Sequence, residues 1–225
     1  MPTLNTCGPA PGFTLIEMTI MLVVLSLLTG VFVAPLAARI EASQRREAEA
    51  LLDDIVEALI GFALLHGRLP CPSIEADPAS PAYGLEHPTP CAANIPGYLP
   101  WRTLALPAHD PWGGPRASAA APWTGHWRYL PDKNFTAGAI TLATLPSGAI
   151  QIRDHDNNPI TTVESRTVAV VYSTGPNRRD DGRNAAWSPA APVFEAGEPT
   201  PGFDDPLRWI GHPLLVARLA RSGRL

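Results

Sequence analysis

Basic residues are absent from the start of the chain. The first of its 17 lysines and arginines is Arg39, and Glu17 is the single charged residue before it. A secretory signal peptide has a basic segment followed by an apolar core of roughly 7 to 15 residues. The chain has neither, because its apolar segment is much longer and no Lys or Arg precedes it. These absences disfavour a signal peptide cleaved near Leu36-Ala37-Ala38.

The residue patterns of an enzyme site are also missing. The six histidines are scattered, no Ser or Cys lies in a nucleophile motif, and no glycine-rich phosphate loop follows a predicted strand. The net charge of -4 and the pI near 5.8 disfavour a dedicated nucleic-acid binder. We therefore expect no enzyme, no cofactor and no direct contact with nucleic acid.

One acidic segment begins like a calcium loop but does not continue as one. Asp154, Asp156 and Asn158 have the first spacings of an EF-hand. However, Pro159 stands where glycine is required, and Ser165 stands where the bidentate glutamate belongs. The segment is predicted to be a turn.

The most informative stretch that is present is apolar. No charge interrupts Met18 to Ala38, and at a helical rise of about 1.5 Å per residue this length covers roughly the 30 Å of a bilayer core. Glu17 lies inside the apolar segment that begins at Phe13, and an ionised carboxylate at membrane depth costs roughly 2.5 kcal/mol or more. The carboxylate therefore needs a partner, and cleavage after Gly12 would supply one in the α-amino group of Phe13.

The sequence Gly12-Phe13-Thr14-Leu15-Ile16-Glu17, followed by an apolar helix, resembles the N-terminal signature of type IV pilins and of the pseudopilins of type II secretion. The resemblance implies a leader peptide at 1–12 that prepilin peptidase cuts between Gly12 and Phe13. It also implies N-methylation of Phe13 and a role for Glu17 in docking subunits into a helical filament. Leaders in the family usually carry Lys or Arg, whereas this one carries none.

The function that the resemblance implies is a minor pilin or pseudopilin subunit of a type IV pilus or a type II secretion pseudopilus. Its partners would be prepilin peptidase, other pilin or pseudopilin subunits and the bacterial inner membrane, which it would cross once with its C-terminal domain in the periplasm. The alternative is a membrane-tethered periplasmic binding module that does not polymerise and binds glycan through tryptophans such as Trp101 and Trp112. A secreted enzyme has the least support, because no catalytic pattern is present.

The expected fold is α+β and pilin-like, with a long N-terminal helix packed on a small antiparallel sheet. The first part of this helix, 13–38, would span the membrane, and Pro35 would kink it by removing one backbone hydrogen bond. The second part, 39–67, is amphipathic, and Gly67 and Pro70 favour its end. Its apolar positions are Leu51, Leu52, Ile55, Val56, Leu59, Ile60 and Ala63.

The remaining residues, 68–225, are predicted to form one globular periplasmic domain. Residues 68–125 are rich in proline and glycine and suit an irregular connection, which Trp101 and Trp112 would fix to the core. Alternation of apolar and polar residues over 126–173 predicts strands at 126–130, 139–145, 149–153 and 166–173, with a hairpin at Pro146–Gly148. Within 174–225, a short C-terminal helix would begin near Phe203-Asp204-Asp205-Pro206 and break near Gly211-His212-Pro213. The side chains expected to face the long helix are Ile140, Leu142, Ile150, Ile152, Val168 and Val170.

Cys71 and Cys91 are the cysteines that would remain after removal of the leader. On the exported side they are expected to form a disulfide, which would contribute about 3 kcal/mol by the chain-entropy estimate. Metal binding is the alternative, and it would need further ligands, for which His66 and His87 are the nearby candidates.

A second acidic loop, Gly175 to Asn184, is similar in position to the calcium loop of major pseudopilins. Asn177, Asp180 and Asp181 are its candidate oxygen ligands. Three arginines in the same loop would supply internal counter-charge, which disfavours a bound cation.

Overall fold

The computed structural model describes residues 12–88, 91, 97–186, 188–190 and 192–225, with only the helical backbone at 29–35. The chain divides into two units, Met1–Ser43 and Gln44–Leu225. Helix α1, Leu15–His66, has 52 residues and begins in the first unit and ends in the second. The predicted α+β class with a long N-terminal helix is confirmed. Among the described residues, no helix combines the length and apolar character needed to cross a membrane.

The first unit consists of the beginning of α1 and the residues before it. Gly12, Phe13 and Thr14 precede the helix, and the apolar side chains that follow, up to Leu28, are exposed. The predicted kink at Pro35 stays a prediction: α1 is helical through this position, and nothing further is described for residues 29–35.

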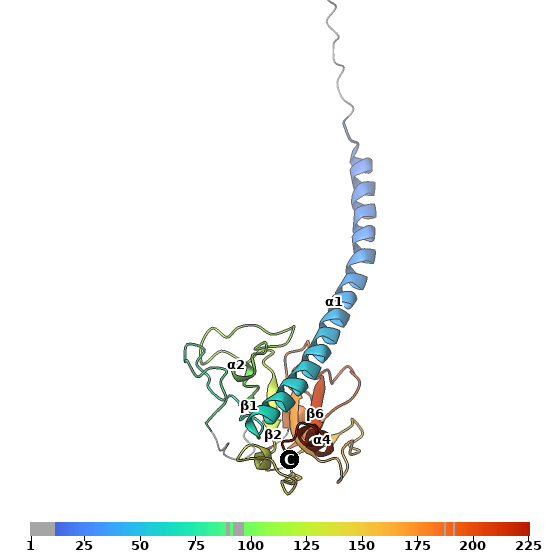
Figure 1. Ribbon diagram of the computed structural model, residues 1–225. Coiled ribbons are helices and arrows are strands. Elements are labelled where there is room, and N and C mark those ends of the chain that lie inside the picture. Colours follow the sequence, from blue (N-terminus) through green and yellow to red (C-terminus); the bar gives the residue numbers. More distant parts are fainter. Residues whose placement is uncertain (1–11, 89–90, 92–96, 187, 191) are drawn as a thin grey trace, which may run out of the picture. The chain divides into compact units, whose positions relative to one another are not determined.

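The second unit contains two small sheets (Figure 1). The larger is antiparallel, with the strand order β1-β2-β4-β6. The smaller pairs β3 with β5 in parallel. The strands are β1 Gly97–Tyr98, β2 Arg128–Pro131, β3 Gln151–Arg153, β4 Thr167–Tyr172, β5 Val193–Glu195 and β6 Leu207–Gly211. The short helices are α2 Trp101–Leu104, η1 Lys133–Phe135, α3 Gly182–Ala186 and α4 His212–Arg221.

The larger sheet is covered on both faces, which explains why β4 is buried at every position. On one face, Tyr129 and Val171 pack with Leu52 and Leu59 of α1 and with Leu215 of α4. On the other face, the side chains of the smaller sheet complete a second cluster, formed by Leu130, Val170, Tyr172, Ile152, Phe194 and Leu207. Each fully buried side chain of this kind contributes roughly 1.5 to 3 kcal/mol.

Three predicted strands match β2, β3 and β4, but the strand predicted at 139–145 is wrong. This segment turns back on itself, because the backbone N–H of Thr141 donates to Thr144 Oγ1 and the backbone N–H of Thr144 donates to the carbonyl oxygen of Thr141. Leu142, expected to face α1, is 71% exposed. The predicted hairpin at Pro146–Gly148 is also wrong. It needs a strand at 139–145 to pair with β3, and β3 pairs with β5 instead.

The side chains expected against α1 divide between the two faces of the sheet. Ile140 and Val168 join the cluster that includes α1, as predicted. Ile150, Ile152 and Val170 belong to the second cluster. The prediction assumed one apolar layer, between the sheet and α1. The structure has two, one on each face of the larger sheet, and the predicted residues are divided between them.

The predicted C-terminal helix starts later than expected. Residues Leu207–Gly211 form β6 along β4, and α4 begins at His212 with Pro213 in its first turn. Leu207 and Ile210 serve opposite faces of the sheet, which helical spacing cannot achieve. Gly211-His212-Pro213 therefore starts a helix, where the sequence had predicted a break.

The proline-rich connection is fixed to the core as predicted. Trp101 and Trp112 are buried, at 6% and 7% exposure. The Asp110 carboxylate accepts hydrogen bonds from the backbone N–H of Trp112 and from the hydroxyl of Ser173, just after β4. This contact joins the loop to the centre of the larger sheet.

Candidate functional site

The predicted cleavage and docking residues lie together at the start of α1. Thr14 is the residue immediately before the helix, and its hydroxyl oxygen accepts the backbone N–H of Glu17 at 3.3 Å. In return, Glu17 Oε2 accepts the backbone N–H and the hydroxyl of Thr14, each at 3.2 Å. This reciprocal pair is a capping box, which satisfies backbone donors that the first helical turn leaves free.

The capping box fixes the beginning of α1 and leaves the residues before Thr14 outside the helix. Gly12 and Phe13 lie outside α1, so the peptide bond between them is not part of the helical hydrogen-bond pattern. Phe13 is 71% exposed. The predicted cleavage site is thus a short non-helical segment next to a rigid helix.

The other polar side chains of the apolar stretch Phe13–Leu28 also find partners within the helix. The hydroxyl of Thr19 donates to the carbonyl oxygen of Leu15, and that of Ser26 donates to the carbonyl oxygen of Val23, both at 2.8 Å. Together with the Thr14–Glu17 pair, these bonds give every polar side chain of the stretch an intrahelical partner. Such satisfaction lowers the cost of placing a hydroxyl or a carboxylate in an apolar environment.

Apolar side chains cover this stretch on every side. Leu15 is 88% exposed, and the large apolar residues from Ile16 to Leu28 are each about half exposed or more. A continuous exposed apolar surface of this kind is typical of a contact with lipid or with another protein.

Thr14 is a site residue that the functional prediction did not include. A signal for it exists in the sequence, because Thr followed three residues later by Glu before an apolar run is the capping-box pattern.

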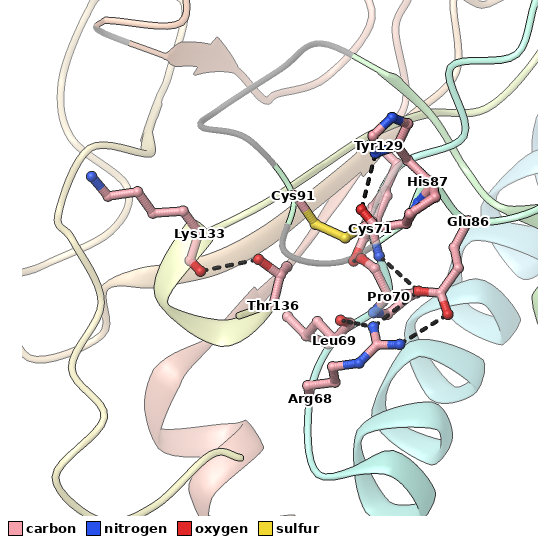
Figure 2. Close-up of a disulfide and its surroundings, with 11 residues drawn as sticks. Arg68, Leu69, Pro70, Cys71, Glu86, His87, Cys91, Tyr129, Lys133 and Thr136 are labelled. Carbon is pink, nitrogen blue, oxygen red and sulfur yellow. Dashed lines mark hydrogen bonds and ion pairs between the residues drawn. A yellow bond between two sulfur atoms is a disulfide. The ribbon is translucent and has the colours of Figure 1, made fainter. Parts of the chain in front are cut away.

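The predicted disulfide between Cys71 and Cys91 is present (Figure 2). Arg68, just after α1, forms a two-pronged ion pair with Glu86, with both N–O distances at 2.9 Å. Glu86, which lies within the loop that the disulfide closes, also accepts the backbone N–H of Cys71. The loop is therefore held beside Cys71 by a hydrogen bond as well as by the disulfide.

The alternative metal site at these cysteines has no support in the geometry. The Cys71 sulfur is bonded to that of Cys91. His66 stacks on Phe62 and its Nδ1 lies 3.1 Å from the Phe62 carbonyl oxygen.

The tryptophans predicted for glycan binding are not available as flat platforms. Trp101 and Trp112 are buried. The ring of Trp123 stacks on that of Tyr98, with 3.7 Å between the ring centroids. Arg116 Cζ lies 3.9 Å from the centroid of the Trp123 ring. The Trp123 ring is therefore already stacked within the protein.

Of the three predicted calcium ligands, Asn177 and Asp181 are in contact, whereas Asp180 is paired elsewhere. Asp180 pairs with Arg128 of β2 at 3.0 Å and accepts the hydroxyl of Tyr172. Asn177 donates through its side chain to Asp181. The positive charge that pairs with Asp180 therefore comes from Arg128 of β2 and not from the arginines of its own loop.

Asp181 instead lies close to Asp204 and Asp205, with carboxylate oxygens within 4.8 Å of one another. Carboxylates in such a group could hold a hard cation. Without one, burial is the main cause that raises the pKa of Asp205 to about 7, and the charges of Asp181 and Asp180 add to it. Sequence spacing could not identify this group, because Asp204 and Asp205 lie far along the chain from Asp181, in the segment just before β6, and only the fold brings them together.

No protein-family model, no curated protein and no solved structure matches the chain.

Proposed function

We propose that this chain is a minor pilin or pseudopilin subunit, which prepilin peptidase cuts between Gly12 and Phe13 and which then joins a type IV pilus or a type II secretion pseudopilus. Before assembly it would reside in the bacterial inner membrane through residues 13–38, with a pilin-like periplasmic domain. The observation that carries the proposal is the arrangement at the start of α1.

Three features of that arrangement support it. The Gly12–Phe13 peptide lies outside the helix, where a peptidase can bind it in an extended form. Glu17 uses Oε2 to cap its own helix, and its Oε1 has no hydrogen-bond partner among the described residues, so it can accept the Phe13 amino group of another subunit. The rest of the stretch is apolar and internally satisfied, as burial in lipid or in a filament core requires.

Replacing Glu17 with valine tests the docking role. The substitution removes the charge that the proposal places at membrane depth, together with one cap of α1. The processed protein should therefore still accumulate in the membrane with its second unit folded. Its crosslinking to the pilus or pseudopilus fraction should fall at least tenfold, because the amino group of the next subunit loses its charged partner.

Glu41→Val is the matched control, because Glu41 is an exposed acid on the same helix outside the apolar stretch. It should assemble like the wild type. Entry of the Glu17→Val protein into filaments at the wild-type level would show that Glu17 is not the docking group.

A further inference from the structure

Strand β6 is an edge of the larger sheet. Among the described residues it pairs only with β4. The backbone N–H of Ser173 donates to the carbonyl oxygen of Pro206, and Tyr172 lies opposite Leu207 and Val170 opposite Trp209. In an antiparallel ladder the hydrogen-bonded and non-hydrogen-bonded pairs alternate. Leu207 and Trp209 therefore direct their backbone N–H and C=O groups away from β4. The Leu207 carbonyl oxygen already accepts a hydrogen bond from Nη1 of Arg208 at 3.2 Å. Among the described residues, the N–H of Leu207 and both groups of Trp209 remain for an added strand.

This free edge lies in a groove of about 360 Å³ that follows Pro206 to Trp209. Arg45 and Glu49 of α1 form one side of it. Gly197, Glu198 and Pro199, in the loop after β5, form another. Proteins can bind an extended peptide by adding it as a strand to an exposed sheet edge, with pockets for alternate side chains.

We propose that this groove binds an extended segment of a partner protein, which adds a strand to the free edge of β6. The half-buried ring of Trp209 and the side chain of Ile160, 39% exposed, give the groove an apolar surface for one side chain of the segment. Specificity in this mode comes from such alternate side chains, while affinity comes from the main-chain hydrogen bonds.

The charges of the groove define the segment further. Arg208 is already paired with Asp53 at 2.8 Å. Arg45, Glu49 and Glu198 have no ion-pair partner among the described residues. Two of these three free charges are acidic, so the segment carries a basic residue close to its apolar one.

The shape of the groove favours a free segment over a second copy of the chain. Arg45 and Glu49 of α1 line one side of the groove, and Gly197, Glu198 and Pro199 line another. The occupant that suits a site bounded in this way is an extended segment without flanking structure. This inference does not depend on the proposed filament function.

Panning a phage-displayed library of random linear peptides against the full chain in detergent micelles tests the proposal. Enriched peptides should share an apolar residue and a nearby basic residue. The synthetic peptide, followed by fluorescence polarisation, should bind at least tenfold more weakly to the Glu49→Ala/Glu198→Ala double variant. It should bind normally to Asp54→Ala, because Asp54 is an exposed acid of α1 outside the groove.

Methylation of the peptide's own backbone nitrogens gives a test that cannot unfold the protein. Blocking alternate nitrogens should abolish binding, while blocking those between them should not, because only alternate N–H groups of an added strand face β6. Failure to enrich any binder would overturn the proposal. So would binding that ignores the groove variants, methylation effects without a period of two, or self-association of the chain that Trp209→Ala abolishes.

Discussion

Asp205 and His126 are both buried, and burial shifts the pKa of each toward its neutral form. For Asp205 the pKa rises to about 7. For His126 it falls to about 4. The two residues therefore affect the stability of the second unit in opposite directions over the same range of pH.

Asp205 should make the folded state less stable as the pH rises. Between its unfolded pKa of about 4 and its folded pKa near 7, the folded state holds a proton that the unfolded state has lost. At roughly 1.4 kcal/mol for each pKa unit, the unfolding free energy should fall by about 4 kcal/mol across this range. Asp205→Asn should remove that fall, as measured by urea unfolding in EDTA, which keeps cations from the Asp181–Asp204–Asp205 group. An identical pH profile for wild type and variant would contradict the assignment.

His126 should make the folded state more stable as the pH rises. Its ring lies against Tyr83, whose hydroxyl is 3.0 Å from Nε2, and against Trp123. Between pH 4 and 6.5 the unfolded state binds a proton that the folded state does not, so stability should increase by about 3 kcal/mol over this range.

Unfolding in the Asp205→Asn background isolates this contribution of His126 from the opposing one. Adding His126→Gln to that background should flatten the remaining slope. A slope that persists after both substitutions would assign the effect to other groups.

At the scale of elements, α1 was predictable from the sequence, because its signals are local and agree with one another. Gly67 and Pro70 follow the observed end at His66, and Leu52, Ile55 and Leu59 are buried as their spacing predicts. The start of the helix at Leu15, just after Thr14, was also indicated in the sequence by the capping-box pattern.

The strands were less predictable, because their signals depend on distant partners. Residues 139–145 alternate like a strand, yet no neighbouring strand pairs with them in the described part of the chain. Leu207 to Gly211 reads as helix by spacing, yet pairing with β4 makes it a strand. The smaller sheet joins residues 151–153 to 193–195, and no local pattern indicates a parallel pair of this kind.

The disulfide is the element-scale feature whose contribution can be measured directly. Replacing Cys71 and Cys91 together with serine should lower the unfolding free energy by about 3 kcal/mol, because the unfolded chain regains the freedom of the closed loop. The Arg68–Glu86 ion pair should keep the folded loop in place. Urea unfolding of wild type and double variant at one pH measures the difference. A loss well under 1 kcal/mol would show that the unfolded chain is already restricted without the bond.

At the scale of the whole molecule, the chain joins two units of different chemistry. The first exposes an apolar stretch, Phe13–Leu28, whose polar side chains find partners within the same stretch. The second buries two apolar clusters on the two faces of a sheet. This division agrees with the proposal of a subunit that assembles through its N-terminal helix and presents a folded domain.

The mature N-terminus tests the central claim most directly. Mass spectrometry of the protein recovered from its native envelope should find a chain that begins at Phe13 with a methylated amino group, and a Gly12→Leu variant should remain uncut, because the peptidase needs close approach to the backbone that glycine permits. A native chain that begins at Met1, or one cut beyond the apolar stretch near Ala38, would contradict the claim.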